Sequence, residues 1–547
     1  MTIIITKIAD KIIKSNRVKN TLQDIHIHSS NCGCHGSFKS NSVMNQTFSS
    51  FSSLTTEKNE QQQQQLFKQF SNSKPIPMGR KVELDTSKVI DSVYFGNTEN
   101  NNYRTNKGNT DYAFEASANN IRFGSGVTYE VGYDLLDMNC RNVIVFTDNN
   151  LLKLVDTDKE SAVAKCLYSL EKCGIKYTIY SDVSIEPTDT SFKDAISVMG
   201  KGRYDGVVAV GGGSVMDTAK AANLYNSYPP ADNDFLAYIN PPIGKGLLVP
   251  GPLKRPLIAI PTTCGTASET TGVCILDIKL GDGLSAKTGI ASRHLKPILG
   301  LVDPDNLLTL PSNVAISSGF DQLCHALESF TAIPFNQRSP RPLAPNQRPS
   351  YQGANPVSDV WSLRSLEMLC KNIHRFVLNP NDDYARSQMM LAASYAGLGF
   401  GNSGVHACHG MSYSISSMVK DYKPEGYYGL KKNLIPHGQS VILSAPAVFK
   451  FTAPSNPERH LLLAKIMGAD ISNASESDAG VLLSNQIVKL MKLLNVPNGL
   501  QALGYKESDI DSLVKGTLPQ HRVTKLMPKQ ATYDDLYKLF KDSMTIY

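Results

Sequence analysis

The sequence predicts an α/β domain built on a parallel, Rossmann-like sheet, followed by an all-α domain and preceded by a disordered N-terminal leader. Short Val- and Ile-rich runs alternate with helical stretches over residues 111–311, which is the pattern of a parallel sheet with crossover helices. Stretches with helical periodicity fill residues 312–547. Residues 1–110 show neither pattern and form the predicted leader and linker.

Length and composition support a multidomain globular protein. The chain has 547 residues, of which 41% are hydrophobic and 19% charged, as in ordinary soluble proteins. This length exceeds what one hydrophobic core supports, so two or more domains are expected. The sequence has no apolar run of about 18 residues, and no membrane-spanning helix is expected.

The net charge of +6 is concentrated at the N-terminus. Residues 1–80 hold ten Lys and Arg against four acidic residues, which leaves 45 basic and 45 acidic groups in the rest of the chain. This balance argues against nucleic-acid binding, which requires a basic surface on the folded domains. Small-molecule substrates, including anionic ones, are the expected partners, and the sequence is compatible with a homo-oligomer.

The first 110 residues have the composition of a targeting leader followed by a low-complexity linker. Isoleucines of the first twelve residues lie near one helical face among lysines, and the next forty residues are rich in Ser and Asn. An amphipathic, basic and acid-poor segment is typical of a mitochondrial transit peptide, which predicts import into the matrix. The alternative is a disordered cytosolic extension. Gln61–Gln65 and Asn97–Asn109 bury too little apolar surface to fold and are expected to be linker.

Four short runs after the linker are expected to be strands of a parallel sheet, and all except residues 176–180 are apolar enough to be buried. They cover residues 141–147, 176–180, 205–210 and 257–260. Helical stretches separate them, one ending at Leu170 and another near Ser191–Met199. Because ligands of such sheets bind at the carboxyl ends of the strands, the residues after each run are the first candidates for a binding site.

The third run leads directly into a glycine-rich loop, which consists of Gly211, Gly212, Gly213 and Ser214. Glycines let the backbone approach a diphosphate, and the free N–H groups of a following helix point at the anion. A helix expected from about Val215 therefore makes this a phosphate-binding loop, with Asp217 in its first turns. The loop matches neither GxGxxG nor a P-loop. Lys220 is expected to be a surface lysine of the helix.

Two other strand ends carry polar residues. Asp148 is placed to bind the two ribose hydroxyls of an adenosine, and its carboxylate would repel a 2′-phosphate, which favours NAD over NADP. An N-cap of the next helix is an equally good interpretation. Thr262 and Thr263 lie in a loop, Pro261–Glu269, whose hydroxyls and glycine suit a polar ligand, although a capped helix start explains part of the pattern.

The C-terminal half contains candidate metal ligands on its helices, which are expected near residues 313–331, 357–377, 382–398, 405–419 and 478–494. Asp321 and His325 are four residues apart and project from one helical face. His406 and His409 follow on a later helix, and His437 lies in a Pro-His-Gly segment. One carboxylate and three imidazoles can hold a divalent ion with a position left for substrate. Spacing alone does not decide between His406 and His409.

The sequence resembles the iron-containing alcohol dehydrogenases from Asp111 to the C-terminus. The motifs that carry the resemblance are GGGSVMDTAK, PTTCGTASETT, GFDQLCHALESF, FGNSGVHACHGMSY and IPHG. TDYAFE, GVHACHGMSY and VKGTLPQHRVTKL further resemble a mitochondrial branch of that family that transfers hydride between a hydroxyacid and an oxoacid.

The resemblance implies a role for each candidate residue. The catalytic metal ligands would be Asp321, His325, His409 and His437, with His409 preferred over His406 by its distance from the FGN motif. The NAD-binding residues would be Asp148, Gly211, Gly212, Gly213, Ser214, Asp217, Thr262, Thr263 and Lys287. Lys287 would also act close to the reacting atoms, although a surface lysine is the alternative. Tyr413 stands where the family often has another active-site histidine.

The activity implied is oxidation of 4-hydroxybutyrate or a similar hydroxyacid, with the hydride passed through bound NAD to 2-oxoglutarate to give 2-hydroxyglutarate. The metal implied is Fe²⁺, although the ligand types suit Zn²⁺ as well. An NAD-dependent alcohol dehydrogenase that releases NADH, a lyase similar to dehydroquinate synthase, and a catalytically silent NAD-binding protein are the alternatives.

A Pro-rich insertion after the first metal-ligand helix carries Arg338, Arg341 and Arg348. One hypothesis is that at least one of them covers the cleft between the domains and pairs with a substrate carboxylate, because arginine suits bidentate recognition. A solvated loop is the favoured interpretation, because charged loop residues are ordinarily exposed.

Overall fold

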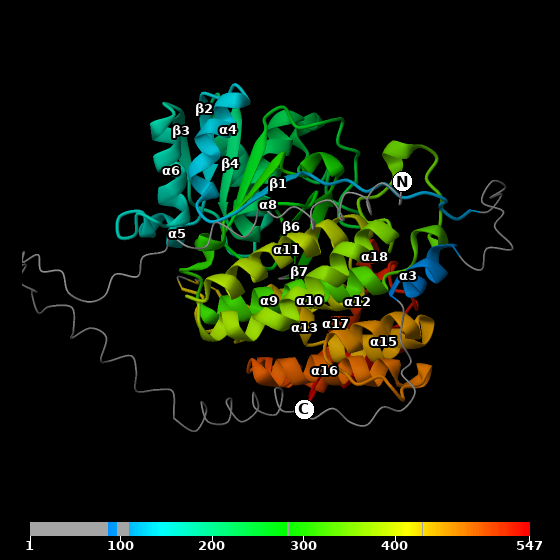
Figure 1. Ribbon diagram of the computed structural model, residues 1–547. Coiled ribbons are helices and arrows are strands. Elements are labelled where there is room, and N and C mark those ends of the chain that lie inside the picture. The colour runs from blue at the N-terminus through cyan, green and yellow to red at the C-terminus, as the bar shows by residue number, and fades with distance from the viewer. Residues whose placement is uncertain (1–85, 96–108, 282–283, 429, 431) are drawn as a thin grey trace, which may run out of the picture. The chain divides into compact units, whose positions relative to one another are not determined.

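The computed structural model describes residues 86–95 and 109–547, apart from 282, 283, 429 and 431 (Figure 1). All of these residues belong to one compact unit, Pro75–Tyr547. The predicted transit peptide and both low-complexity tracts lie outside the described residues, except for the last residue of the Asn-rich tract. No helix within the described ranges is long and apolar enough to cross a membrane.

A six-stranded parallel sheet forms the centre of the α/β part, with the strand order β1-β8-β5-β4-β2-β3. The strands are β1 (Asn120–Phe123), β2 (Asn142–Phe146), β3 (Lys176–Tyr180), β4 (Gly206–Gly211), β5 (Leu257–Pro261) and β8 (Leu299–Val302). Every residue of β4 and β5 is buried, since both lie inside the sheet and are covered on both faces. The predicted Rossmann-like sheet is confirmed, and all four predicted strands belong to it.

Helices cover both faces of this sheet. Alternate residues of β2 and β4 point to opposite sides: Val143 and Val208 pack in one apolar cluster with residues of α4 and α6, whereas Ile144 and Val207 pack with residues of α7 and α8. The helices of this part are α4 (Val131–Asp137), α5 (Asn149–Leu154), α6 (Ala162–Lys172), α7 (Asp189–Lys201) and α8 (Gly213–Ser227).

An antiparallel hairpin, β6 (Val273–Gly281) and β7 (Leu284–Ala291), follows β5 and forms a separate two-stranded sheet. The sequence did not indicate this hairpin, nor the short strands β1 and β8. Its position matters for the site, because β7 packs against helix α12 (Ala407–Ser417) of the C-terminal half.

The C-terminal half is helical, as predicted, and holds the largest apolar core. Figure 1 shows its helices in yellow-green to red below the sheet. Besides α12, they are α9 (Ser312–Thr331), α10 (Pro356–Leu378), α11 (Asp383–Ser403), α13 (His437–Ile442), α14 (Ala445–Thr452), α15 (Pro457–Ile466), α16 (Ala479–Leu493), α17 (Ile510–Thr517), α18 (His521–Thr524) and α19 (Tyr533–Asp542). Helix α9 is buried along nearly its whole length and packs against α10, α11 and α13.

One helix lies where the sequence predicted linker. Helix α3 (Thr86–Phe95) packs against α10 and α15. The Tyr94 hydroxyl donates to Asp359 Oδ2 at 2.7 Å, and Arg459 Nη2 binds Asp359 Oδ1 at 2.6 Å. The Arg459 guanidinium also lies 3.6 Å from the centre of the Phe330 ring. A short amphipathic segment gives little sequence signal, and long-range burial decides its structure.

Replacing Tyr94 by Phe is expected to lower the free energy of unfolding by about 1–2 kcal/mol, because Asp359 stays buried and loses one donor. Urea denaturation of Y94F measures the change. The matched control is Tyr428→Phe, whose side chain is 70% exposed and which should unfold like the parent. Equal midpoints for Y94F and the parent would show that α3 is not fastened by this hydrogen bond.

Candidate active site

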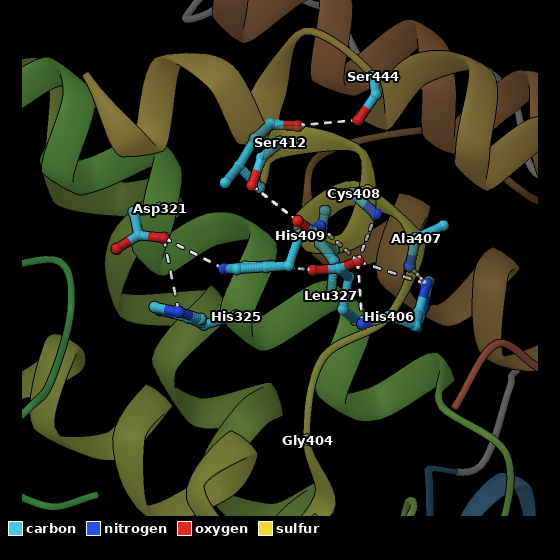
Figure 2. Close-up of polar contacts among 12 residues, drawn as sticks. Asp321, His325, Leu327, Gly404, His406, Ala407, Cys408, His409, Ser412 and Ser444 are labelled. Carbon is cyan, nitrogen blue, oxygen red and sulfur yellow. Dashed lines mark hydrogen bonds and ion pairs between the residues drawn. The ribbon is translucent and has the colours of Figure 1, made fainter. Parts of the chain in front are cut away.

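Four side chains converge on one point between three helices, and Figure 2 shows three of them, Asp321, His325 and His409. The Nε2 atoms of His325, His409 and His437 lie 3.5, 3.4 and 3.6 Å from Asp321 Oδ1, respectively. Asp321 and His325 come from α9, His409 comes from α12, and His437 is the first residue of α13. The structure therefore brings together all four residues that the sequence analysis nominated as metal ligands.

Close helix packing produces this convergence. A Cβ at Gly438 would lie 1.8 Å from the Ser317 carbonyl oxygen and 2.9 Å from the Asp321 backbone nitrogen. Only a glycine lets the start of α13 approach the α9 backbone so closely, and this approach carries the neighbouring His437 to Asp321. His325 is fixed from the other side, because its ring stacks on Phe400 with centroids 3.8 Å apart and planes 9° apart.

The donor atoms are chemically suited to a divalent ion. Asp321 Oδ1 and His409 Nε2 are buried and make no hydrogen bond within the described part of the chain. One suitable atom from each of Asp321, His409 and His437 lies within 4.8 Å of the others. Buried polar atoms without partners are costly, so a cation bound by carboxylate and imidazole would satisfy them.

The charge states also fit a cation. Burial lowers the pKa of His325 to about 3 and also lowers that of His437, so both are neutral near pH 7. Burial opposes ionisation of Asp321, yet the surrounding imidazoles hold the pKa of its carboxyl below the usual range. The cluster therefore presents one carboxylate and the neutral imidazoles of His325 and His437.

Glu328, which the sequence analysis missed, orients His409 from behind. Its Oε2 contacts His409 Nδ1, and its Oε1 accepts the backbone N–H groups of His406 and Cys408 at 3.1 and 2.7 Å. Glu328 is fully buried. Burial opposes its ionisation, but His409 and His406 lower its pKa to about 2. A carboxylate on the far nitrogen of a ligand histidine fixes the ring and raises its basicity. Helical spacing contained a signal, since Glu328 lies three residues after His325.

His406 has a different role from His409. Its Nδ1 accepts the Ala407 backbone N–H at 2.8 Å, and its Nε2 pairs with Thr331 Oγ1 at 2.9 Å. Burial lowers its pKa to about 4. Both ring nitrogens of His406 are occupied within the protein, so of the two candidates only His409 presents a nitrogen to Asp321.

Metal binding at a pH slightly above 6.5 is expected to release about one proton. Burial disfavours charge on His409, yet Glu328 and Asp321 raise its pKa well above the ordinary value. The His409 ring must therefore lose its Nε2 proton before that nitrogen can bind a metal ion. His325 and His437 are already neutral and lose none. Metal affinity should accordingly rise with pH up to the pKa of His409 and level off above it.

Titration calorimetry of metal-free protein in buffers of different ionisation enthalpy measures this proton release. The variant Glu328→Gln should release a smaller fraction of a proton, because the carboxylate that raises the His409 pKa is gone. The exposed Glu507→Gln variant is the control and should behave like the parent. Equal proton release by E328Q and the parent would contradict the assignment.

The glycine loop forms a cradle at the carboxyl end of β4. Helix α8 begins at Gly213, and no side chain caps it. A Cβ at Gly213 would lie 2.7 Å from Thr266 Cγ2, and one at Gly212 would lie 3.2 Å from Thr263 Cγ2. Backbone without Cβ atoms and an uncapped helix N-terminus suit a diphosphate, as the sequence predicted. The helix begins two residues earlier than expected.

Three predicted cofactor residues lie around this loop. The Thr262 backbone N–H donates to the Gly211 carbonyl at 3.2 Å. The Thr263 hydroxyl is buried and has no hydrogen-bond partner among the described residues, which suits a polar ligand. Asp217 accepts Ser268 Oγ at 2.7 Å and the Ile275 backbone N–H at 2.9 Å, so it also holds the loops together.

Lys220 is not the surface residue that the sequence predicted. It is fully buried, and its Nζ donates to Ser268 Oγ at 2.6 Å and to the Val273 carbonyl at 2.9 Å. Helix α8 lies between the sheet and the β6–β7 hairpin and is buried on most sides. The prediction was wrong because the hairpin that covers this face was not foreseen.

Asp148 is the N-cap of α5, where it accepts the backbone N–H groups of Asn150 and Leu151 at 2.8 and 3.1 Å. The second interpretation of Asp148, an N-cap of the following helix, is therefore confirmed. The position at the carboxyl end of β2 is also the one expected for a ribose-binding carboxylate, so binding of the adenosine ribose stays a prediction.

Lys287 on β7 is buried beside the metal cluster and is not a surface lysine. Its Nζ pairs with Glu186 Oε2 at 2.5 Å and with Asp277 Oδ1 at 3.2 Å. Burial disfavours the ammonium, but the two carboxylates raise the pKa of Lys287 above its usual value. Glu186 was not foreseen, because its pairing partner lies 101 residues away in the sequence.

One cavity of about 110 Å³ joins the two halves of the site. It is lined by Gly213, Ser214 and Asp217 from the glycine loop and α8, by Lys287 and Glu186, and by all four members of the metal cluster. Tyr351 and Tyr413 complete its wall. The predicted cleft between an α/β part and a helical part is thus present, and the predicted phosphate-binding and metal-ligating residues line the same space.

The three arginines of the Pro-rich insertion do not line this cavity. Arg348 pairs with Asp111 at 3.1 Å, Arg341 lies over the Tyr112 ring at 4.0 Å, and Arg338 donates to the Gln352 carbonyl at 3.5 Å. The hypothesis that at least one of them pairs with a substrate carboxylate finds no support at this cavity and stays a prediction, because Arg341 and Arg348 contact residues 111–112 instead.

Comparison with known proteins identifies the family. The family model of iron-containing alcohol dehydrogenases matches residues 118–304, and the C-terminal model of the same family matches residues 350–544. The chain is 55% identical over 437 residues to the mitochondrial hydroxyacid-oxoacid transhydrogenase of Mus musculus, which covers 80% of this chain and 91% of that protein. It is 53% identical over 438 residues to the Homo sapiens protein of the same name, covering 80% and 91% of the two chains.

Solved structures agree in fold. The 1,3-propanediol oxidoreductase structure matches 79% of this chain and all of its own, with a TM-score of 0.66 and 25% identity. Sulfoacetaldehyde reductase from Bifidobacterium kashiwanohense, solved in complex with NAD⁺, matches with a TM-score of 0.62 and 24% identity over 80% of this chain and 100% of its own. On the evidence of the two family models and of relatives more than 50% identical, the chain belongs to the iron-containing alcohol dehydrogenase family.

Proposed function

We propose that the protein is a hydroxyacid-oxoacid transhydrogenase. It oxidises 4-hydroxybutyrate or a similar hydroxyacid and reduces 2-oxoglutarate to 2-hydroxyglutarate, with the hydride carried by NAD. The observation that supports this most is the single cavity lined by both the glycine loop and the Asp321 cluster, in a chain 55% identical to a named transhydrogenase over 91% of that protein's length.

The site residues fall into two groups in this proposal. The first group would hold a divalent ion, which would lower the pKa of a bound substrate hydroxyl; it consists of Asp321, His325, His409 and His437. The second group would bind NAD, which would accept and return hydride; it consists of Gly211–Ser214, Asp148, Asp217, Thr262, Thr263 and Lys287. We infer Fe²⁺ as the ion. Elemental analysis of anaerobically purified protein tests this, and full activity with zinc alone would overturn it.

Side chains around the cavity hold the proposed metal ligands and Lys287 in position. Glu328 holds His409 in the orientation that presents Nε2, and Phe400 fixes the plane of His325. Lys287 is held by Glu186 and Asp277, which keeps a cation at the cavity wall. The Tyr413 hydroxyl accepts Arg522 Nη2 at 2.7 Å, so its own proton is free to point at a substrate oxygen. The small volume limits the amount of water beside the reacting atoms.

The deciding experiment supplies 4-hydroxybutyrate and 2-oxoglutarate to the holoenzyme without added NAD and measures 2-hydroxyglutarate. We expect product formation with many turnovers per bound NAD and ping-pong kinetics. Product that forms only with stoichiometric free NAD would instead identify an alcohol dehydrogenase that releases NADH. Absence of any redox product would favour a lyase or a silent NAD-binding protein.

The cellular location follows the same relatives. We propose a mitochondrial protein of the matrix, because the two transhydrogenases compared above are named mitochondrial and the first 80 residues are basic and acid-poor. Fusion of residues 1–110 to a fluorescent protein tests it, and a diffuse cytosolic signal would contradict it.

A further inference from the structure

A second cavity, of about 580 Å³, shares Tyr351 with the catalytic cavity. We name it the basic pocket, because Arg338, His521, Arg522 and Lys525 all line it. None of the described residues that line it is acidic. The pocket is positively charged, although basic and acidic groups are equal in number after residue 80. Such a local positive charge favours an anionic ligand.

Arg522, which lines this pocket, has an unsatisfied donor. Its Nη2 donates to the Tyr413 hydroxyl at 2.7 Å, and its guanidinium lies 5.0 Å from the centre of the Tyr351 ring. Its Nη1 is buried and has no hydrogen-bond acceptor within the described ranges. A buried guanidinium nitrogen without an acceptor is costly, so the arrangement is suited to a ligand that brings its own acceptor.

The basic pocket is close to the reacting atoms. Tyr413 lies four residues after the proposed ligand His409 on α12, which is one helical turn. Helix α18, which carries His521 and Arg522, packs against α12. Arg522 therefore contacts two tyrosine side chains that line the catalytic cavity.

We propose that the basic pocket binds the distal carboxylate of a dicarboxylate oxoacid, with Arg522 as its principal ligand and Arg338 and Lys525 as supporting charges. The proposal rests on the proposed function, which supplies 2-oxoglutarate as substrate. The anion is not a phosphate of the cofactor, because no residue of the glycine loop lines the basic pocket. Arginine binds carboxylates through paired hydrogen bonds and so selects for them by geometry.

Binding constants of two oxoacids test the proposal. Equilibrium titration of the holoenzyme gives Kd for 2-oxoglutarate, which has a distal carboxylate, and for 2-oxobutyrate, which lacks one. Arg522→Gln is expected to raise the ratio of the Kd for 2-oxoglutarate to the Kd for 2-oxobutyrate about tenfold or more, and Lys525→Gln is expected to raise it about threefold. Lys515→Gln, in an exposed pair with Asp511, is the matched control and should leave the ratio unchanged.

Arg522 also supports two tyrosines, so its variant alone does not decide. If R522Q does not fold, Lys525→Gln and Arg338→Gln are measured instead, and an unchanged Kd ratio in both overturns the proposal. Equal weakening of both oxoacids in the variants would also overturn it, because that result indicates a general structural role. Failure of the proposed function is seen separately, as a wild-type enzyme that binds 2-oxoglutarate but forms no 2-hydroxyglutarate.

Discussion

Replacing Asp321 by Asn is expected to reduce 2-hydroxyglutarate formation by more than about 100-fold and to leave the purified protein largely without metal. Asp321 Oδ1 is the one atom that all three imidazole Nε2 atoms approach within 3.4–3.6 Å. An amide oxygen keeps the shape of the side chain but removes the negative charge that balances a divalent ion. Elemental analysis and initial rates of product formation measure the two effects.

The exposed Asp534→Asn variant carries the same chemical change outside the site and should match the parent in both measurements. Circular dichroism shows whether D321N is folded. A folded D321N that retains metal and more than one tenth of the parental activity would contradict the ligand assignment.

Replacing Gly438 by Ala is expected to destabilise the metal-free protein by about 3 kcal/mol and to weaken metal binding. The added Cβ would lie 1.8 Å from the Ser317 carbonyl oxygen, so α13 must move away from α9. Because His437 is the first residue of α13, the same movement displaces its ring from Asp321. Urea denaturation and metal titration measure the two effects.

Gly401→Ala is the matched control. Gly401 lies within α11, and a Cβ there would have 3.4 Å to its nearest neighbour, Thr271 Cγ2, which is ordinary contact. Alanine is the better helix former, so G401A should be neutral or slightly stabilising. Parental stability and metal affinity in G438A would show that α13 can shift without moving His437.

The sequence predicts the parallel sheet and the helical half well because both have local signals. Buried strands such as β2, predicted at residues 141–147 and observed at Asn142–Phe146 with four of its five residues buried, need only a short apolar run. The glycine loop and the pair Asp321 and His325 likewise follow from spacing within a single element. Elements that depend on distant partners were missed: the β6–β7 hairpin, and helix α3, whose Tyr94 bonds a residue 265 positions away.

In the candidate site, too, local spacing predicts some features, whereas others depend on contacts between distant residues. Spacing could not choose between His406 and His409, because both lie at the start of one helix. Contacts across helices distinguish them, since His406 caps its own helix and bonds Thr331 whereas His409 faces Asp321. Lys220 and Lys287 resemble surface lysines in a linear sequence, and only the hairpin that buries them reveals their polar partners.

The position of α18 bears on how the active site is completed during folding. Arg522 contacts two tyrosines that line the catalytic cavity, yet α18 follows β8, the last strand of the sheet, far along the chain. The sheet can therefore form in a chain that extends only to β8, whereas the support of this part of the cavity wall also needs α18. Chains cut short before α18 would contain every proposed metal ligand and still lack a finished active site.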